Sequence, residues 1–147
     1  MEERLAKTGV SVFVVNDQMQ ILLGVRKSIP GFGNGKWQLP GGELQHMESW
    51  DNCCKREVLE ETSLVIENVE FITAIEDMHI EADQHYVTGF FVASVLSGEA
   101  QVTEPDKCEK WEWFNIEELL PWMTFLDIQD VLDDFYDKIY DYIEQER

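Results

Sequence analysis

The sequence predicts an α+β fold, an αβα sandwich in which a mixed β-sheet lies between helices. Short runs rich in β-branched and aromatic residues recur between residues 9 and 116 and are separated by turn residues, which is typical of strands. One stretch with helical features interrupts these runs at 49–62, and an amphipathic stretch closes the chain at about 125–144. Because helices and sheets each bury an apolar face, this order favours helices packed on a sheet in one domain, 1–147.

The N-terminal third is predicted to be strands joined by turns. The β-branched run GVSVFVV at 9–15 indicates a buried strand. Asn16-Asp17 indicates a turn, after which the chain returns as a second strand at 20–27. The remaining elements of this third are a loop at 28–36, a short strand at 36–39 and a tight turn at Pro40-Gly41-Gly42.

A helix is predicted next, because Ser49 is a suitable N-cap for a helix that runs to about Thr62. Strands follow at 64–80, with an interruption, and then at 85–96 and 110–116, before a short helix at 117–120.

The last segment predicts an amphipathic helix that packs on the domain. Its apolar residues recur at helical spacing and are Ile128, Val131, Leu132, Phe135, Ile139 and Ile143. Thr124 is the expected N-cap, with Asp127 in the first turn. The aromatic residues are assigned to packing, either in the core or in a homodimer, so the sequence leaves the oligomeric state open.

Composition and charge exclude several classes of partner. The chain has 147 residues, 44% of them hydrophobic, and a net charge of −19, so we expect a globular domain. No basic face is visible for a nucleic acid polymer or a membrane surface. No signal peptide and no run of 18 apolar residues is visible, so a cytoplasmic protein is expected. Cys53, Cys54 and Cys108 lack metal-ligand spacing and are expected to be reduced thiols.

Three glutamates form the most informative cluster. Glu57, Glu60 and Glu61 are spaced i, i+3 and i+4, so their side chains share one face of the predicted helix. At about 100° per residue, Trp50 and the cysteine pair Cys53-Cys54 fall on that same side. Carboxylates at the edge of a buried face repel one another and need partners, and hard divalent cations such as Mg²⁺ prefer oxygen ligands of this kind.

The stretch GELQHMESWDNCCKREVLEETSL, residues 42–64, resembles the signature of the Nudix hydrolases, G-x5-E-x7-R-E-U-x-E-E-x-G-U, with U a bulky aliphatic residue. The residues in register are Gly42, Glu48, Arg56, Glu57, Val58, Glu60, Glu61 and Leu64. Ser63 departs, because the pattern has glycine there, in a left-handed conformation after the helix. Further segments, LLGVRK, KWQLPGGEL, HYVTGFFV and EPDKCEKWEWF, resemble the MutT-like branch, so the resemblance covers about residues 8–120.

The resemblance implies a Nudix-type fold and a metal site. In it, Glu57, Glu60 and Glu61 hold Mg²⁺ or Mn²⁺, and the backbone carbonyl of Gly41 faces the metal. Glu57 also serves as general base, which makes Glu57, Glu60 and Arg56 the candidate catalytic residues. Arg56 orients a catalytic glutamate.

Other positions are assigned by the same resemblance. Glu48 is a weaker candidate, as a metal ligand or a neighbour of the ligands, and Arg26 contacts substrate phosphates. Glu104 and Glu109 are both candidates for an additional metal ligand, and the sequence does not choose between them. Trp111 and Trp113 alternate along a strand and therefore share one of its faces, where core packing or base stacking is open.

The sequence therefore predicts a Mg²⁺-dependent hydrolase that splits nucleoside triphosphates, oxidised ones among them, into monophosphate and pyrophosphate. Two alternatives stay open. One is a hydrolase of a nucleoside diphosphate derivative such as a nucleotide sugar or ADP-ribose, and the other is a catalytically silent domain that binds nucleotide.

Overall fold

A computed structural model describes residues 5–27, 36–119 and 124–146, and within these ranges the side chain of Leu126 is not described. The strands are β1 (Lys7–Val15), β2 (Gln20–Arg26), β3 (Trp37–Gln38), β4 (Gly41–Glu43), β5 (Val65–His79), β6 (Gln84–Ser97) and β7 (Cys108–Asn115). The helices are α1 (Trp50–Thr62), the short 3₁₀-helix η1 (Ile116–Glu118) and α2 (Leu126–Gln145). The predicted loop at 28–36 lies almost wholly outside the described residues.

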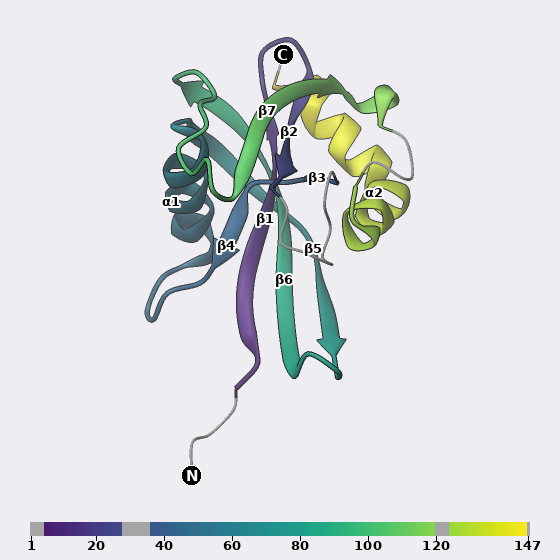
Figure 1. The fold of residues 1–147 in the computed structure, drawn as a ribbon. Coiled ribbons are helices and arrows are strands. Elements are labelled where there is room, and N and C mark those ends of the chain that lie inside the picture. The colour runs from purple at the N-terminus through teal and green to yellow at the C-terminus, as the bar shows by residue number, and fades with distance from the viewer. Residues whose placement is uncertain (1–4, 28–35, 120–123, 147) are drawn as a thin grey trace.

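The strands form one mixed sheet. Its main order is β3-β2-β1-β6-β5, while β4 pairs with β1 and β7 pairs with β2. The pairing of β1 with β6 is parallel, and the other pairings are antiparallel. Helices α1 and α2 lie on opposite sides of this sheet (Figure 1). The predicted α+β fold, with a mixed sheet between helices, is therefore confirmed.

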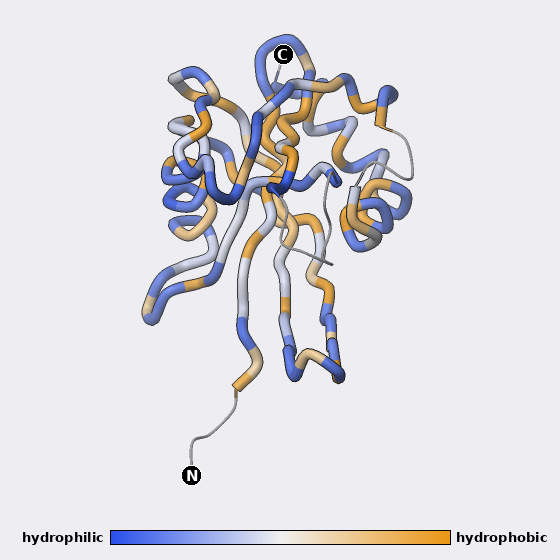
Figure 2. The backbone as a smooth tube through the Cα atoms, in the orientation of Figure 1, coloured by the Kyte–Doolittle hydropathy of each residue, from blue (hydrophilic) through white to orange (hydrophobic). Residues whose placement is uncertain are grey.

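Each face of the sheet has its own hydrophobic core, and β1 contributes to both. Phe13 and Val15 pack in the core beneath α2, whereas Val12 and Val14 pack in the core beneath α1. This alternation follows from the period of two along a strand. Hydrophobic segments accordingly concentrate on the central strands and hydrophilic ones in the connecting loops (Figure 2). Within the described ranges, no helix has both the length and the apolar character needed to cross a membrane.

The glycines at 41 and 42 correct one prediction. They do not form a tight turn but belong to β4, where Gly41 pairs with Ser11 and Gly42 with Val10 of β1. A Cβ at Gly41 would overlap the carbonyl oxygen of Val10. Glycine is therefore required here for the close approach of two strands and not for a turn conformation.

The cap of α2 corrects a second prediction. The N-cap is Phe125 and not Thr124, whose hydroxyl lies 3.5 Å from the side-chain oxygen of Gln129. Asp127 does lie in the first turn, as predicted, and its carboxylate accepts the backbone N–H of Ile128 at 2.9 Å. A first-turn carboxylate thus satisfies one of the free backbone donors at the start of the helix.

Helix α1 begins and ends as the sequence predicts. The hydroxyl of Ser49 accepts the backbone N–H of Asn52 at 3.1 Å, which caps the N-terminus. At the other end Ser63 is left-handed, with φ 67°, and its N–H donates to the carbonyl of Leu59 at 3.0 Å. A residue with a Cβ is strained in this conformation.

We predict that Ser63→Gly raises the free energy of unfolding by roughly 0.5–1 kcal/mol, because glycine adopts positive φ without strain. A urea melt of both proteins measures the difference. Ser97→Gly is the matched control, since Ser97 ends β6 and is not among the residues of positive φ. The control should be neutral or destabilised, and destabilisation of Ser63→Gly would contradict the prediction.

Candidate active site

Two carboxylates of α1 lie over the backbone of β4. The carboxylate of Glu57 lies so close to Gly42 that a Cβ at that position would overlap it. One turn further, Oε2 of Glu61 accepts the backbone N–H of Gly41 at 3.3 Å. The two glycines therefore have a second purpose, because a strand without side chains lets the carboxylates of a helix approach its backbone.

Arg56 connects the acidic residues around this point. Its guanidinium forms a two-pronged pair with Glu48, from Nε at 2.7 Å and from Nη2 at 2.9 Å. Nη1 donates to Glu57 at 2.7 Å and to Glu60 at 3.3 Å, and Nη2 also donates to the carbonyl of Glu43 at 3.0 Å. Only 22% of the Arg56 side chain is exposed, so these charge-assisted bonds lie in a partly desolvated place.

The pKa values of the acids diverge because their environments differ. The hydrogen bonds from Arg56 lower the pKa of Glu48 to about 2. Burial raises the pKa of Glu57 in spite of its bond to Arg56. Burial also raises the pKa of Glu61 to about 8, since the hydrogen bond from Gly41 opposes it only in part and the charges of Glu57 and Glu104 add to it. Burial thus favours the neutral form of the Glu61 carboxyl.

Glu60 points elsewhere. Its side chain is 55% exposed and is drawn towards Arg56. Among residues 5–27, 36–119 and 124–146, no three His, Cys, Asp or Glu side chains converge closely enough to hold a metal ion.

The residues present fit a hard divalent cation. Glu57 and Glu61 supply oxygen donors, the ligand type that Mg²⁺ takes. Burial disfavours their charged forms, and a cation would relieve that cost. The structure thus brings Glu57 and Glu61 to the glycines of β4. Glu60 is linked to Glu57 through Arg56, which donates a hydrogen bond to each of them. The metal site remains a prediction.

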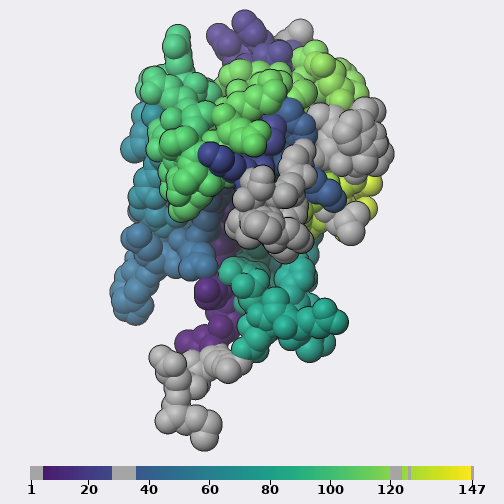
Figure 3. Space-filling view, in the orientation of Figure 1, coloured from purple at the N-terminus to yellow at the C-terminus, as the bar shows by residue number. Residues whose placement is uncertain are grey.

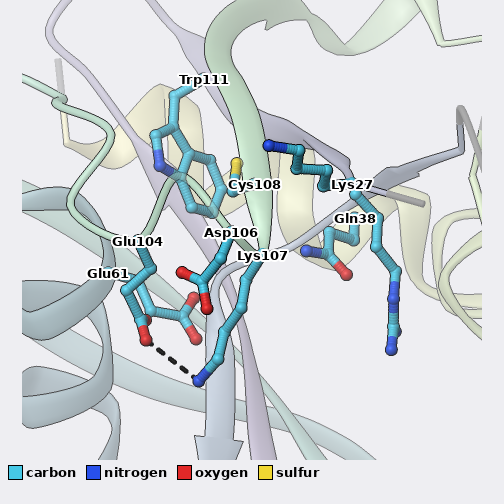
Figure 4. Close-up of a pocket in the computed structure, with 9 residues that line it drawn as sticks. Lys27, Gln38, Glu61, Glu104, Asp106, Lys107, Cys108 and Trp111 are labelled. Atoms are coloured by element: carbon cyan, nitrogen blue, oxygen red, sulfur yellow. Dashed lines mark ion pairs between the residues drawn. The ribbon is translucent and has the colours of Figure 1, made fainter. Parts of the chain in front are cut away.

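A cavity of about 290 Å³ opens beside Glu61. Figure 4 shows Glu61 and Glu104 on one side of it, where the Lys107 ammonium pairs with Glu104 at 3.0 Å, and Lys27 on the other side. The predicted phosphate ligand Arg26 lines this cavity and also lines a second hollow of about 620 Å³. Gln38 borders both hollows as well, so the two hollows meet at these side chains.

The back of the smaller cavity is formed by β7 and β2. Trp111 and Cys108 line it, and Gly24 of β2 lies against them: a Cβ there would come within 2.7 Å of the Trp111 ring and 2.9 Å of the Cys108 sulfur. The indole N–H of Trp111 is buried without a hydrogen-bond partner. Trp111 and Trp113 both pack against the core beneath α1, as expected for one face of a strand.

Several lining residues were missed by the sequence analysis. Lys27, Gln38 and Lys107 fall within segments that resemble the MutT-like branch but were given no role, and the pairings of β2 with β3 and with β7 bring these segments together. Of the two open candidates for an additional ligand, Glu104 lines the cavity with Glu61, whereas Glu109 does not. For the three missed residues, the signal available in the sequence was their place in these three segments.

Comparison with known proteins identifies the family of this fold. Residues 5–135 match the family described as the NUDIX domain. An oxidized purine nucleoside triphosphate hydrolase of Danio rerio is 32% identical over 100 residues, which cover 68% of this chain and 61% of that protein. A putative 8-oxo-dGTP diphosphatase of Bacillus subtilis (strain 168) is 34% identical over 92 residues, 63% of this chain and 56% of that one. This chain thus matches about three fifths of the length of these relatives.

A solved structure agrees with this placement. The MutT NUDIX hydrolase of Burkholderia pseudomallei superimposes with a TM-score of 0.77 at 28% identity, covering 88% of this chain and 98% of that one. The fold is that of the MutT-like NUDIX domains, and here an acidic helix lies over a strand that begins with two glycines. The chain belongs to the NUDIX family.

We predict that the stability of the metal-free protein depends on pH through Glu61. The pKa of Glu61 is raised to about 8 in the folded protein. The folded state therefore binds a proton that the unfolded state releases at lower pH, so the wild type loses stability as the pH rises from the unfolded pKa to about 8. Glu61→Gln should therefore gain on the wild type between pH 5 and pH 8, by at least about 1 kcal/mol.

Denaturant melts in EDTA at pH 5, 6, 7 and 8 measure this gain. Glu60→Gln is the control, and it should give a smaller gain because the Glu60 side chain is half-exposed. A constant difference between Glu61→Gln and the wild type across this range would contradict the assignment.

Proposed function

We propose that the protein is a Mg²⁺-dependent hydrolase of nucleoside triphosphates, which it splits into monophosphate and pyrophosphate. One observation carries the proposal: Glu61, one helical turn from Glu57, lines a cavity that is also lined by Arg26, Lys27 and Lys107. Carboxylates that can bind a metal ion therefore lie next to lysine and arginine side chains that can bind phosphate. A metal-bound phosphate chain satisfies both groups.

The residues suit in-line attack by water on a phosphorus atom. Mg²⁺, when bound, would neutralise the phosphate oxygens and lower the pKa of the attacking water. Glu57 accepts the proton of that water, while Arg56 holds the carboxylate in place through the 2.7 Å hydrogen bond from Nη1. The bond between the α- and β-phosphates breaks, and pyrophosphate leaves. Glu60 and Glu61 contribute the remaining charge of the metal site.

Arg26 is assigned to the phosphates of the substrate. It ends β2 and lines both hollows, so its guanidinium stands where a phosphate chain would pass into the larger one. The larger hollow, with Leu39, Phe125 and Ile128 among its lining residues, offers the apolar surface that a nucleoside needs.

The class of substrate follows from charge and from the relatives. Three cations in one cavity match a triphosphate better than a nucleotide sugar, which carries less charge. The names of the two relatives above refer to oxidised purine nucleoside triphosphates and to 8-oxo-dGTP. Oxidised purine nucleoside triphosphates are therefore the first substrates to test.

We predict that activity requires a divalent cation and that Glu57→Gln, Glu60→Gln or Glu61→Gln each lowers kcat/KM by at least about 10²-fold, because each removes a charge from the metal site. Steady-state assays with Mg²⁺ and with EDTA measure this. Glu81→Gln, in the turn between β5 and β6, is the control and should keep full activity. Full activity in EDTA, or in any of the three variants, would disprove the metal site.

We predict that Arg26→Ala lowers kcat/KM for triphosphates by the equivalent of roughly 1.5–3 kcal/mol, the range of a charge-assisted hydrogen bond. The loss should be smaller for nucleotide sugars, and Lys55→Ala on the outer side of α1 should have no effect.

Chromatography of the reaction mixture identifies the products. Monophosphate and pyrophosphate are expected from each triphosphate. Nucleoside diphosphate with orthophosphate, or cleavage of sugar-linked diphosphates alone, would contradict the proposed function.

A further inference from the structure

The loop 98–107, which joins β6 to β7, covers the C-terminal end of α1. The last carbonyls of a helix have no partner within the helix itself. Here the hydroxyl of Thr103 donates to the carbonyl of Glu60 at 2.5 Å, and the backbone N–H of Gln101 donates to the carbonyl of Thr62 at 2.8 Å. In the space-filling view the loop accordingly lies against α1 (Figure 3). The loop and the end of the helix therefore form one hydrogen-bonded unit.

The residue after Thr103 is also held from its other side. The carbonyl of Glu104 accepts the backbone N–H of Lys107 at 2.9 Å and that of Cys108 at 3.0 Å, which makes a turn into β7. Cys108 is buried and pairs with Arg26 of β2. The backbone of Glu104 thus lies between two fixed points, the end of α1 and the start of β7.

The hydrogen bond of Thr103 joins the neighbours of two acids. Glu104 follows Thr103 in the chain, and Glu61 follows Glu60, whose carbonyl accepts the bond. The side chains of Glu61 and Glu104 line the same cavity and lie on the same side of it (Figure 4). One contact between the loop and the helix therefore fixes the distance between segments that each supply a carboxylate.

The charges of these acids do not hold the loop in place. The charge of Glu104 contributes to the raised pKa values of Glu57 and Glu61, so the three carboxylates are close enough to repel one another. Lys107 pairs with Glu104 at 3.0 Å, but its side chain is 70% exposed, and an exposed ion pair contributes little. A neutral hydrogen bond such as that of Thr103 opposes this repulsion without adding charge.

We propose that Thr103 is a positioning residue, whose hydroxyl holds Glu104 beside Glu61 so that a divalent cation meets carboxylates that are already in place. This proposal rests on the proposed function, because it assumes the metal site of that function. Thr103 lines neither hollow and acts only through its neighbour. Without the hydroxyl, repulsion moves Glu104 away, and cation binding has to restore the loop at a cost in affinity.

Binding of Mn²⁺ in the absence of nucleotide tests this role without turnover. Electron paramagnetic resonance measures the Mn²⁺ that remains free in solution. Thr103→Val keeps the shape of the side chain but removes the donor, and it should weaken Mn²⁺ binding by roughly three- to tenfold, the loss of one hydrogen bond. Thr103→Ser keeps the hydroxyl and should bind Mn²⁺ within about twofold of the wild type.

A double variant distinguishes positioning from a general effect on the fold. Glu104→Gln removes the charge and should weaken Mn²⁺ binding by about tenfold or more. Because Thr103 acts through Glu104, adding Thr103→Val to Glu104→Gln should change the affinity by less than about twofold. Thr73→Val is the matched control, since it removes a hydroxyl from β5 at a residue that lines neither hollow, and it should bind like the wild type.

Four results would overturn the positioning role. They are unchanged Mn²⁺ affinity in Thr103→Val or in Glu104→Gln, an equal loss in Thr103→Ser, an equal loss in Thr73→Val, and a full additional loss in the double variant. Thermal melts in EDTA establish that the variants are folded. Thr103→Ala, which removes the same hydroxyl, carries the test if Thr103→Val does not fold.

The two proposals fail separately. If the wild type binds Mn²⁺ and converts triphosphates to monophosphate and pyrophosphate while Thr103→Val binds Mn²⁺ equally well, the positioning role alone is wrong. If Mn²⁺ binding depends on Thr103 and Glu104 but no triphosphate is hydrolysed, the proposed function is wrong and the positioning role stands. If the wild type binds no Mn²⁺, the metal site and the positioning role are both wrong.

Discussion

The arrangement of the candidate site depends on the guanidinium of Arg56. Its side chain joins Glu48, Glu57 and Glu60 and also reaches the backbone of β4 through the carbonyl of Glu43. Without this cation, neighbouring carboxylates on one helix would repel one another. The geometry of the bonds matters as much as the charge, because the planar guanidinium holds Glu48 with two parallel bonds, which a lysine cannot do.

The opposite side of helix α1 is anchored by buried apolar side chains. Cys53, Cys54 and Val58 are fully buried in the core shared with β1, and burial of such side chains is the main stabilising contribution in folding. Helix α1 therefore has one side in the core and one side over a glycine strand. Glu57 and Glu61 lie at the boundary between them, where burial is deep enough to raise their pKa values and solvent still has access.

Local patterns made much of this visible in the sequence. The spacing of three glutamates, the cap at Ser49 and the serine at a left-handed position are all set within one helix and its ends, and the structure has the cap and the left-handed serine as predicted. Features that depend on distant pairing were missed or wrong. Gly41 and Gly42 indicate a turn only as long as the pairing of β4 with β1 is unknown, and Lys27 meets Lys107 only through the pairing of β2 with β7. The predicted roles of the site residues stay predictions.

Gly24 shows how this cavity can change during evolution. Any side chain at that position would strike the Trp111 ring and the Cys108 sulfur, so the floor is locked by the backbone and is closed to variation. The rim is different, because Lys27 and Lys107 are exposed and contribute nothing to the core. Mutations there exchange one ligand for another without endangering the fold. A rigid floor and an exposed rim therefore let the charge of the cavity change while its shape is kept.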